Sequence, residues 1–311
     1  MLKIVSAAAL LLFLGVAFMG ASLPQSSQVE SIHNIRIFSV PGSTNTVATG
    51  VDNDGVIIGT FDDANGLHAF IRTRRGSFIT FDAPSATLTL GFDINNAGTA
   101  VGSFINDSGS TDQIGYIRSK AGSFLTFTVP GNDGDTVPVG INSSGEISGF
   151  IEDEATGHRS SFVRSAHGAF RIFSVPGSTR TEASKINDCG TVTGEYQDAA
   201  GFHGFIRTGD GSFTSFELPG PLALQSIGQL GINNRGEIVG QFNDEQGSHG
   251  FLRHADGSVT TIDIESSPST SANDVNDAGT VVGNFIDQDG NLKAFIATHI
   301  PRACSFIRCR D

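Results

Sequence analysis

Short apolar and polar stretches alternate along most of this chain with the two-residue period of β-strands. In residues 230–262, the strand-like segments "LGIN", "EIVGQF", "HGFLR" and "SVTTI" are separated by "NRG", "NDEQG" and "HADG". Asx side chains bond the backbone of such turns, and glycine takes the positive φ that hairpin turns need. The segment therefore predicts four short strands, here named A to D in chain order, joined by tight turns.

This unit occurs six times. Each A–B turn is rich in Asx and ends in a glycine, and these glycines lie 43 to 47 residues apart. They are Gly55, Gly98, Gly145, Gly190, Gly236 and Gly279. A second glycine follows four residues later in strand B: Gly59, Gly102, Gly149, Gly194, Gly240 and Gly283. We expect these strand glycines to pack closely against a neighbouring strand or side chain. Six units of this length and strand content predict an all-β fold, a six-bladed β-propeller of four-stranded antiparallel blades.

The two ends of the repeat region complete one blade. The sixth unit stops after its strand C, near residues 292–298, and no strand D follows. The segment "IRIFSVPGST" at 35–44 repeats the strand D sequence "RIFSVPGST" of 171–179. We therefore expect residues 33–42 to pair with 292–298, which closes the ring and hides a sheet edge. An open β-solenoid, the alternative, needs no split repeat.

The phrases "LHAFIR" at 67–72, "FHGFIR" at 202–207 and "SHGFLR" at 248–253 resemble the HAF-type extracellular repeat family. The glycine-containing element before each phrase resembles it too, and the likeness covers about residues 33–298. Here arginine stands where the family commonly has tryptophan, and units two, three and six lack the histidine. The resemblance implies blade architecture and an extracellular location, and it carries over no enzymatic activity.

Residues 1–22 open with Lys3, run apolar and end in small residues, which predicts a secretory signal peptide. An uncleaved membrane anchor is the alternative, since the run approaches spanning length. We thus predict a leader at 1–22, a linker at 23–32, the propeller at 33–298 and a tail at 299–311. The mature chain would be secreted, extracellular or periplasmic, with no membrane insertion after cleavage.

The formal charge of the whole chain is −13. The leader contains one lysine and no acid, so the charge after its removal is −13 − 1 = −14. Such a surface repels phosphate backbones and anionic lipid headgroups, which argues against nucleic-acid and peripheral membrane binding. We expect a monomer whose partner is an unidentified protein or small ligand.

Acidic residues gather in the B–C connections, whereas several bases lie in the C–D turns. In a four-stranded meander the B–C and D–A connections share one face of the ring, hereafter the B–C/D–A face. Its candidate residues are Glu152, Asp153, Glu154, Asp287 and Asp289. They would form either a solvated rim that aids solubility or a docking surface for cations or a basic partner.

The position two residues before each turn Asx alternates between glycine and a charged residue. It reads Gly50, Asp93, Gly140, Lys185, Gly231 and Asp274 along the chain. If strand A is innermost, Asp93, Lys185 and Asp274 line the central channel, a common place for ligands. The alternative is a hydrated, partly salt-bridged lining.

Two further side chains recur with the repeat. His68, His203 and His249 begin strand C, and we expect them at blade edges, bonding backbone of a neighbour. Arg72, Arg118, Arg164, Arg207 and Arg253 follow an aromatic residue by two positions, which predicts a blade-to-blade ion pair or carbonyl clasp.

No cofactor is expected. The turn "DQDGN" at 287–291 offers calcium oxygens from Asp287, Asp289 and Asn291, but a tight loop needs more ligands. Cys304 and Cys309 are candidates for a disulfide, which would leave Cys189 an odd thiol.

Together these patterns favour a secreted, non-catalytic propeller that acts as a binding or interaction scaffold. A hydrolase or lyase with its site in the channel, by analogy with propeller lactonases, is the alternative. A lectin ranks last, because the chain has no tryptophan and two tyrosines to stack on sugars. No nucleophile elbow or phosphate-binding loop occurs.

Overall fold

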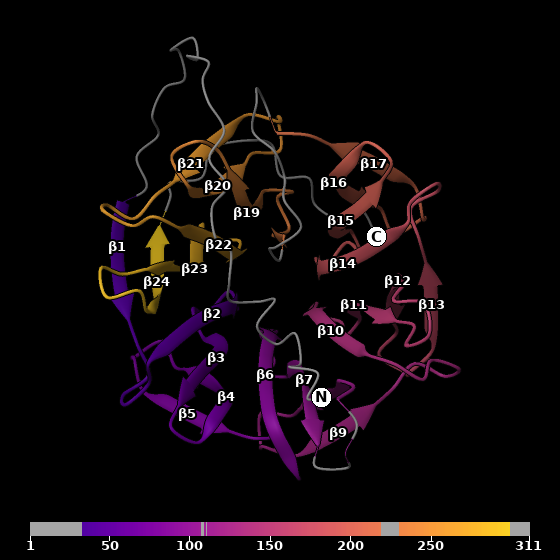
Figure 1. Ribbon diagram of the computed structural model, residues 1–311, viewed down its shortest axis with the longest axis horizontal. Coiled ribbons are helices and arrows are strands. Elements are labelled where there is room, and N and C mark those ends of the chain that lie inside the picture. Colours follow the sequence, from indigo (N-terminus) through magenta and orange to yellow (C-terminus); the bar gives the residue numbers. More distant parts are fainter. Residues whose placement is uncertain (1–32, 107–108, 110, 219–229, 299–311) are drawn as a thin grey trace.

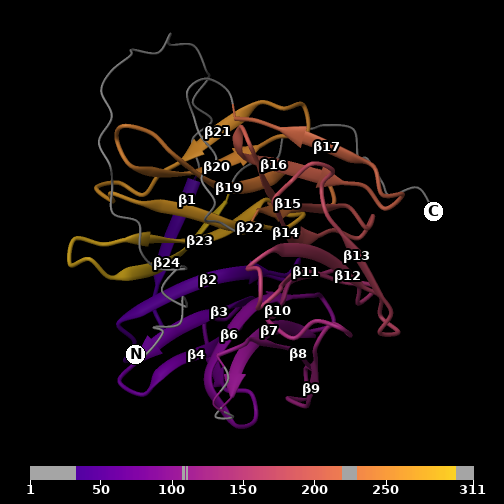
Figure 2. The same cartoon turned by 45° about the vertical axis from the view of Figure 1, so that its right-hand side comes forward.

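A computed structural model describes residues 33–106, 109, 111–218 and 230–298 of the chain. In these residues, strands β1 to β24 form six four-stranded antiparallel sheets arranged around one axis (Figure 1). Oblique views show the blades as separate twisted sheets side by side around the ring (Figure 2). The predicted all-β six-bladed propeller is confirmed.

The first three blades follow in chain order. Blade 1 contains β2 (Asn45–Val51), β3 (Ile57–Asp63), β4 (Gly66–Arg72) and β5 (Phe78–Phe81). Blade 2 contains β6 (Ala86–Ile94), β7 (Ala100–Asn106), β8 (Ile114–Arg118) and β9 (Phe124–Phe127). Blade 3 contains β10 (Thr136–Ile141), β11 (Ile147–Glu152), β12 (Arg159–Arg164) and β13 (Phe170–Phe173).

The other three blades complete the circle. Blade 4 contains β14 (Arg180–Ile186), β15 (Val192–Asp198), β16 (Gly201–Arg207) and β17 (Phe213–Phe216). Blade 5 contains β18 (Gly231–Ile232), β19 (Ile238–Asn243), β20 (Ser248–Arg253) and β21 (Val259–Ile262). Blade 6 contains β22 (Thr270–Val275), β23 (Thr280–Ile286), β24 (Leu292–Thr298) and, as its outer strand, β1 (His33–Phe38).

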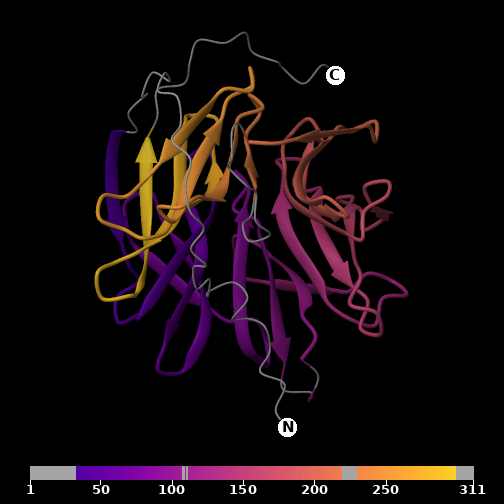
Figure 3. The same cartoon turned by 45° about the horizontal axis from the view of Figure 1, so that its top comes forward.

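The N-terminal strand β1 lies beside β24, as the split repeat predicts (Figure 3). Phe38 pairs with Ala294 and Ile37 with Phe295 in the antiparallel ladder. Blade 6 in turn contacts blade 1, where the backbone N–H of Leu292 donates to Asn45 Oδ1 at 2.8 Å. Backbone hydrogen bonds therefore cover the outer edge of β24 with a strand from the other end of the propeller.

The strand B glycines lie beneath the aromatic side chains of strand C. A Cβ atom on Gly194 would approach the Phe205 ring to 2.6 Å, and one on Gly59 would approach Phe70 to 2.7 Å. Such a Cβ would also collide with a carbonyl of the inner strand, Glu182 O at Gly194. The predicted close packing is confirmed, because the aromatic ring fills the space that a side chain would need.

The repeated arginines join neighbouring blades through aromatic rings. Arg207 lies with its guanidinium carbon 4.6 Å from the ring centre of Phe173, on the outer strand of the preceding blade. Arg118 lies 4.5 Å from Phe81 in the same way. The predicted blade-to-blade role is thus confirmed, but the expected ion pair is wrong: the contact between blades is cation–π. The guanidinium group also donates to a carbonyl, but that carbonyl lies in the turn that follows the arginine itself, as Arg207 donates to Thr208.

Several predictions fall on the ends of the chain. The leader 1–22, the linker 23–32 and the tail 299–311 with Cys304 and Cys309 lie outside the described residues. Cys189, the one cysteine within the described ranges, is disulfide-bonded and not the odd thiol that we expected. No helix in the part of the chain that the structure describes is long and apolar enough to cross a membrane.

Gly194→Val tests the packing of strand B. We expect a loss of about 1–3 kcal/mol in the free energy of unfolding, because the new methyl groups overpack the Phe205 site. Urea denaturation measures the loss. Thr80→Val, at an exposed position of β5, is the control and should leave stability unchanged. Equal stability of both variants would show that the glycine is not required.

Candidate functional site

Six Asx turns surround one end of the central channel, each joining an inner strand to the next strand of its blade. The first Asx of every turn is buried, and together these residues are called the inner Asx ring. They are Asp52, Asn95, Asn142, Asn187, Asn233 and Asn276. Each side chain caps its own turn through one oxygen, as Asn95 Oδ1 does for the N–H groups of Ala97 and Thr99 at 3.1 Å. The hairpin role expected for these turns is confirmed.

The inner Asx ring also ties the blades together. Asn142 Nδ2 donates to the carbonyl of Asn187 at 3.2 Å, and Asn276 Nδ2 donates to the carbonyl of Asp52 at 2.8 Å. Asn95, Asn187 and Asn233 make the same bond to the blade that follows each of them. Five of the six junctions between blades therefore carry this hydrogen bond. Sequence patterns do not reveal this hydrogen bond, because it joins residues about one repeat apart.

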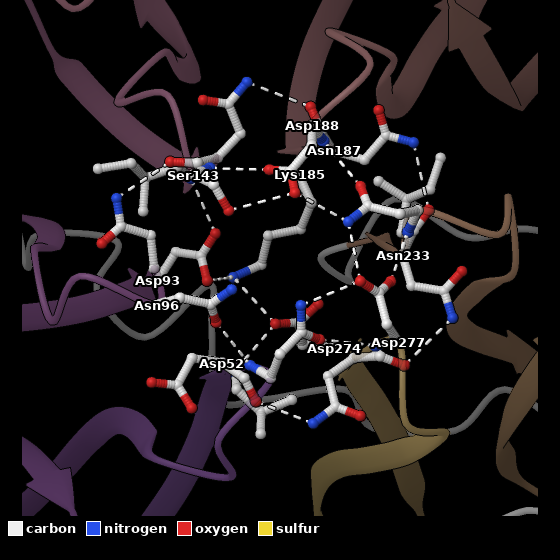
Figure 4. Close-up of a pocket in the computed structure, with 18 of the residues that line it drawn as sticks. Asp52, Asp93, Asn96, Ser143, Lys185, Asn187, Asp188, Asn233, Asp274 and Asp277 are labelled. Atoms are coloured by element: carbon white, nitrogen blue, oxygen red, sulfur yellow. Dashed lines mark hydrogen bonds and ion pairs between the residues drawn. The ribbon is translucent and has the colours of Figure 1, made fainter. Parts of the chain in front are cut away.

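The second residue of each turn is Asx in five blades and serine in blade 3, and these six residues are called the outer Asx ring. Its members are Asn53, Asn96, Ser143, Asp188, Asn234 and Asp277. The backbone N–H of Asp188 donates to Asn234 Oδ1, and that of Asn234 donates to Asp277 Oδ1, both at 2.8 Å. The two rings make the channel mouth a polar network whose groups bond mainly to one another (Figure 4).

The three predicted channel charges do meet beneath these rings (Figure 4). Lys185 Nζ lies 3.1 Å from Asp93 Oδ1 and 3.9 Å from Asp274 Oδ2, and it donates to the carbonyl of Phe92 at 2.7 Å. All three side chains are buried. One lysine from blade 4 thus compensates two carboxylates from blades 2 and 6.

Each carboxylate also accepts hydrogen bonds from the blade that follows its own. Asp93 Oδ2 accepts from the N–H of Ile141 at 2.8 Å, and Asp274 Oδ2 accepts from the N–H of Val51 at 2.9 Å. The inner strands are bulged at this level, for example between Gly91 and Asp93. A bulge redirects the side chain that follows it, which lets it reach across the junction.

The alternating glycines make room for these charged residues. A Cβ atom on Gly50 would lie 2.7 Å from Asp93 Oδ1, and one on Gly140 would lie 2.8 Å from the Cα of Lys185. A Cβ on Gly231 would lie 2.7 Å from the Cα of Asp274. The channel is therefore wide enough for three large side chains and not for six.

Burial affects the protonation of both carboxyl groups. Loss of solvent raises the pKa of Asp274 to about 7, against the attraction of Lys185. Burial also raises the pKa of Asp93, again opposed by the nearby ammonium. The site can therefore hold or release a proton near neutral pH.

The open space in the channel mouth is small. The cavity has a volume of about 70 Å³ and is lined by the two Asx rings and the three charges. A few water molecules fit such a space. Ligand sites for drug-sized molecules are typically about 300–1,000 Å³, so the mouth does not accommodate a substrate of that size.

The three repeated histidines bind carboxylates within their own blades, and the expected bond to neighbouring backbone is wrong. His203 bridges Asp198 Oδ1 at 3.0 Å and Glu217 Oε1 at 2.5 Å, and stacks on Tyr196. These hydrogen bonds, Glu217 first, raise the pKa of His203 despite partial burial. His68 and His249 hold the same place in blades 1 and 5, between two aspartates each.

The predicted acidic residues lie in the B–C connections, except Glu152, which is the last residue of β11. Glu152 pairs with Arg159, and Asp153 caps its own turn by accepting from the N–H of Thr156. Asp287 likewise accepts from the N–H groups of Asp289 and Asn291, so the carboxylate considered for calcium serves its turn. Among the described residues, no group of three or more His, Cys, Asp or Glu side chains is placed to hold a metal ion.

A larger groove, of about 540 Å³, lies on the B–C/D–A face between blades 5 and 6. Its apolar part includes Ile37, Phe38 and Phe285, and its polar part includes Glu265 and Lys293. Sequence reasoning missed this groove, because β1 and blade 5 are adjacent only in the closed ring.

Comparisons with known proteins identify the fold and no family. No family model matches the sequence, so membership of the HAF-type repeat family stays a prediction. No curated protein matches either. The chain is similar in structure to a protein provisionally named TolB from Agrobacterium tumefaciens, with a TM-score of 0.55 and 13% identity over 82% of this chain and 90% of that one.

Two further solved structures are similar to the same extent. A protein provisionally named gluconolactonase has a TM-score of 0.52 and 14% identity, over 86% of this chain and 94% of that chain. TolB from Acinetobacter baumannii has a TM-score of 0.53 and 12% identity, over 83% of this chain and 64% of that chain. At such identities the likeness supports the propeller fold alone.

Lys185→Met tests the charge balance of the channel. We expect a loss of about 3–5 kcal/mol in the free energy of unfolding at pH 8, because two buried carboxylates lose their counter-ion. The loss should shrink near pH 5, where the carboxyl groups can take up protons instead. Urea denaturation at the two pH values measures it. Lys120→Met, at an exposed turn position, is the control, and an equally small effect of both changes would contradict a paired channel lysine.

Proposed function

We propose that this protein is a secreted, non-catalytic propeller that works as a binding or interaction scaffold. The observation that carries the proposal is the state of the channel. Its three charges bond to one another and to backbone groups, and the space left is about 70 Å³. Groups that hold the blades together in this way are poorly placed to bind a substrate, so the binding surface lies elsewhere.

The B–C/D–A face is the surface that supports binding best. Five exposed carboxylates on it have no side-chain partner within the described residues: Asp133, Glu154, Glu245, Glu265 and Asp289. Negative charge accumulates around blade 3, where burial first, and then the carboxylates of Glu152 and Asp112, raise the pKa of Asp135. The groove between blades 5 and 6 opens on the same face.

These features favour a cationic partner. Free carboxylates spread over several blades attract positive charge without any one of them being needed for folding. Attraction of this kind speeds encounter and is screened by salt within about 8–10 Å at physiological ionic strength. A basic protein or peptide is therefore the partner class that we propose.

The test uses a defined basic probe, a ten-residue oligolysine peptide. Neutralising the five exposed carboxylates together to Asn or Gln should reduce binding at least tenfold at 20 mM salt, since much of the attraction is electrostatic. Raising the salt to 500 mM should weaken binding to the unchanged protein as well. Isothermal titration calorimetry measures both.

The controls separate charge at this face from overall charge. Arg75→Gln alters one exposed charge in a C–D turn on the opposite face and should leave oligolysine binding unchanged. An oligoglutamate peptide should not bind. Salt-insensitive binding, or equal binding by the neutralised variant, would reject this face as the docking surface.

A hydrolase or lyase with its site in the channel is the second candidate. One observation favours it: a carboxyl group with a pKa of about 7, Asp274, lies 3.9 Å from the ammonium of Lys185. A group of this kind can act as a general acid or base at neutral pH. The solved structure named gluconolactonase has a similar ring, but its activity cannot be transferred at 14% identity.

Asp274→Asn distinguishes the two candidates. If a screen of lactones and esters finds a turnover, the variant should lose it by at least a hundredfold while its circular dichroism spectrum stays native, because the titrating group is gone. Glu154→Gln, far from the channel mouth, should keep full activity. Turnover that survives Asp274→Asn would place the reaction outside the channel.

A further inference from the structure

Asp52 is the one member of the inner Asx ring that is not asparagine. Its Oδ1 accepts hydrogen bonds from the N–H groups of Asp54 at 2.9 Å and Val56 at 2.8 Å, the same turn bonds that the asparagines of blades 2, 4, 5 and 6 make. Its second oxygen therefore stands where each asparagine has an amide nitrogen. Asp52 is buried, with 6% of its surface exposed.

The junction between blades 1 and 2 differs for this reason. At the other five junctions an Nδ2–H group donates to the carbonyl of the next ring member. The carbonyl of Asn95 should receive the sixth bond, and within the described residues no side chain of blade 1 donates to it. An ionised carboxylate has no hydrogen to give, so this junction lacks the side-chain-to-carbonyl hydrogen bond of the other five.

We propose that Asp52 is a proton-binding site that closes the inner Asx ring: its protonated carboxyl donates to the carbonyl of Asn95, and loss of the proton breaks this one bond between blades 1 and 2. The proton takes the place of the amide hydrogen that the other blades have. Blade 1 is then joined to blade 2 as firmly as the other pairs in acid and less firmly as the pH rises.

The surroundings favour the protonated form. The nearby charges are Asp54 in the same turn, Asp274 and Asp277 on blade 6, Asp93 on blade 2, and Lys185 across the channel. Arg74 packs on the turn at Gly55, with its Cγ 4.0 Å from the Cβ position of that glycine. Lys185 is engaged with Asp93 and Phe92, so it does not serve Asp52.

The sign of the pH dependence follows from these contacts. Burial first, opposed by the turn hydrogen bonds and assisted by Asp54, raises the pKa of Asp52 above its ordinary value. As the pH rises, the folded protein therefore keeps this proton up to a higher pH than the unfolded chain does. The stability from this site is complete below the ordinary pKa of an aspartate and declines as the pH rises through the folded-state value.

Asp52→Asn tests the proposal by supplying the missing N–H group. We expect the melting temperature at pH 7.5 to rise by about 2–4 °C, which corresponds to one added hydrogen bond in a protein of this size. At pH 3, below the ordinary pKa of an aspartate, the variant and the unchanged protein should melt together, because both then have a donor. Asn187→Asp, which moves a carboxyl to another ring position, should show the reverse: a lower melting temperature at pH 7.5 and recovery at pH 3.

Infrared spectroscopy reports the proton directly. The C=O band of a protonated carboxyl should be present at mildly acidic pH, and its Asp52 component should be missing from the difference spectrum of Asp52→Asn. A melting temperature that falls on Asp52→Asn, or one that rises equally at both pH values, would overturn the proposal. If Asp52→Asn does not fold, Asn187→Asp serves as the test. A decrease in its melting temperature that is the same at both pH values would overturn the proposal.

Discussion

Hydrogen bonds between the Asx turns of neighbouring blades are the interaction on which this ring depends. Strand A is the innermost strand of every blade, and its end brings buried polar backbone close to the axis, where little water can reach it. Each of these groups must find a partner in protein. The Asn side chains solve this for two blades at once, because the oxygen caps the turn of one blade and the nitrogen bonds the carbonyl of the next.

The charged layer beneath follows the same constraint. The Asp93 and Asp274 carboxylates bond amides of the following blades, and Lys185 balances them across the axis. Replacing a glycine of the alternating set by a larger residue would close the channel. Farther out, Arg on Phe joins one blade to the next, and Phe on Gly packs two strands of the same blade together. The interior therefore holds the blades together, and the exposed carboxylates of the B–C/D–A face are the groups that we propose for partner binding.

Departures from the repeat are the informative positions. Lys185 occupies a place where blades 2 and 6 have aspartate. A third aspartate there would leave the buried carboxylates of the channel without a counter-ion. Asp52 occupies a place where five blades have asparagine, and an oxygen in place of the amide NH2 group removes the side-chain donor from its junction. The histidines in blades 1, 4 and 5 instead adopt one arrangement three times, between a B–C acid and an acid after strand D.

The sequence by itself determined the number of blades, their strands and turns, and the strand that completes the last blade. These features follow from period-two patterning, turn glycines and the split phrase at residues 35–44, all of which are local. It also marked Gly50, Asp93 and Lys185 as members of an alternating channel set. Only the tertiary structure decided which atoms meet: that Lys185 bonds Asp93, that Arg207 lies on Phe173, and that the carbonyl of Asn95 receives no Asx side-chain donor from blade 1. The physical reason is that such contacts join residues about one repeat or more apart, and their geometry exists only once the bulged inner strands have been brought around a common axis.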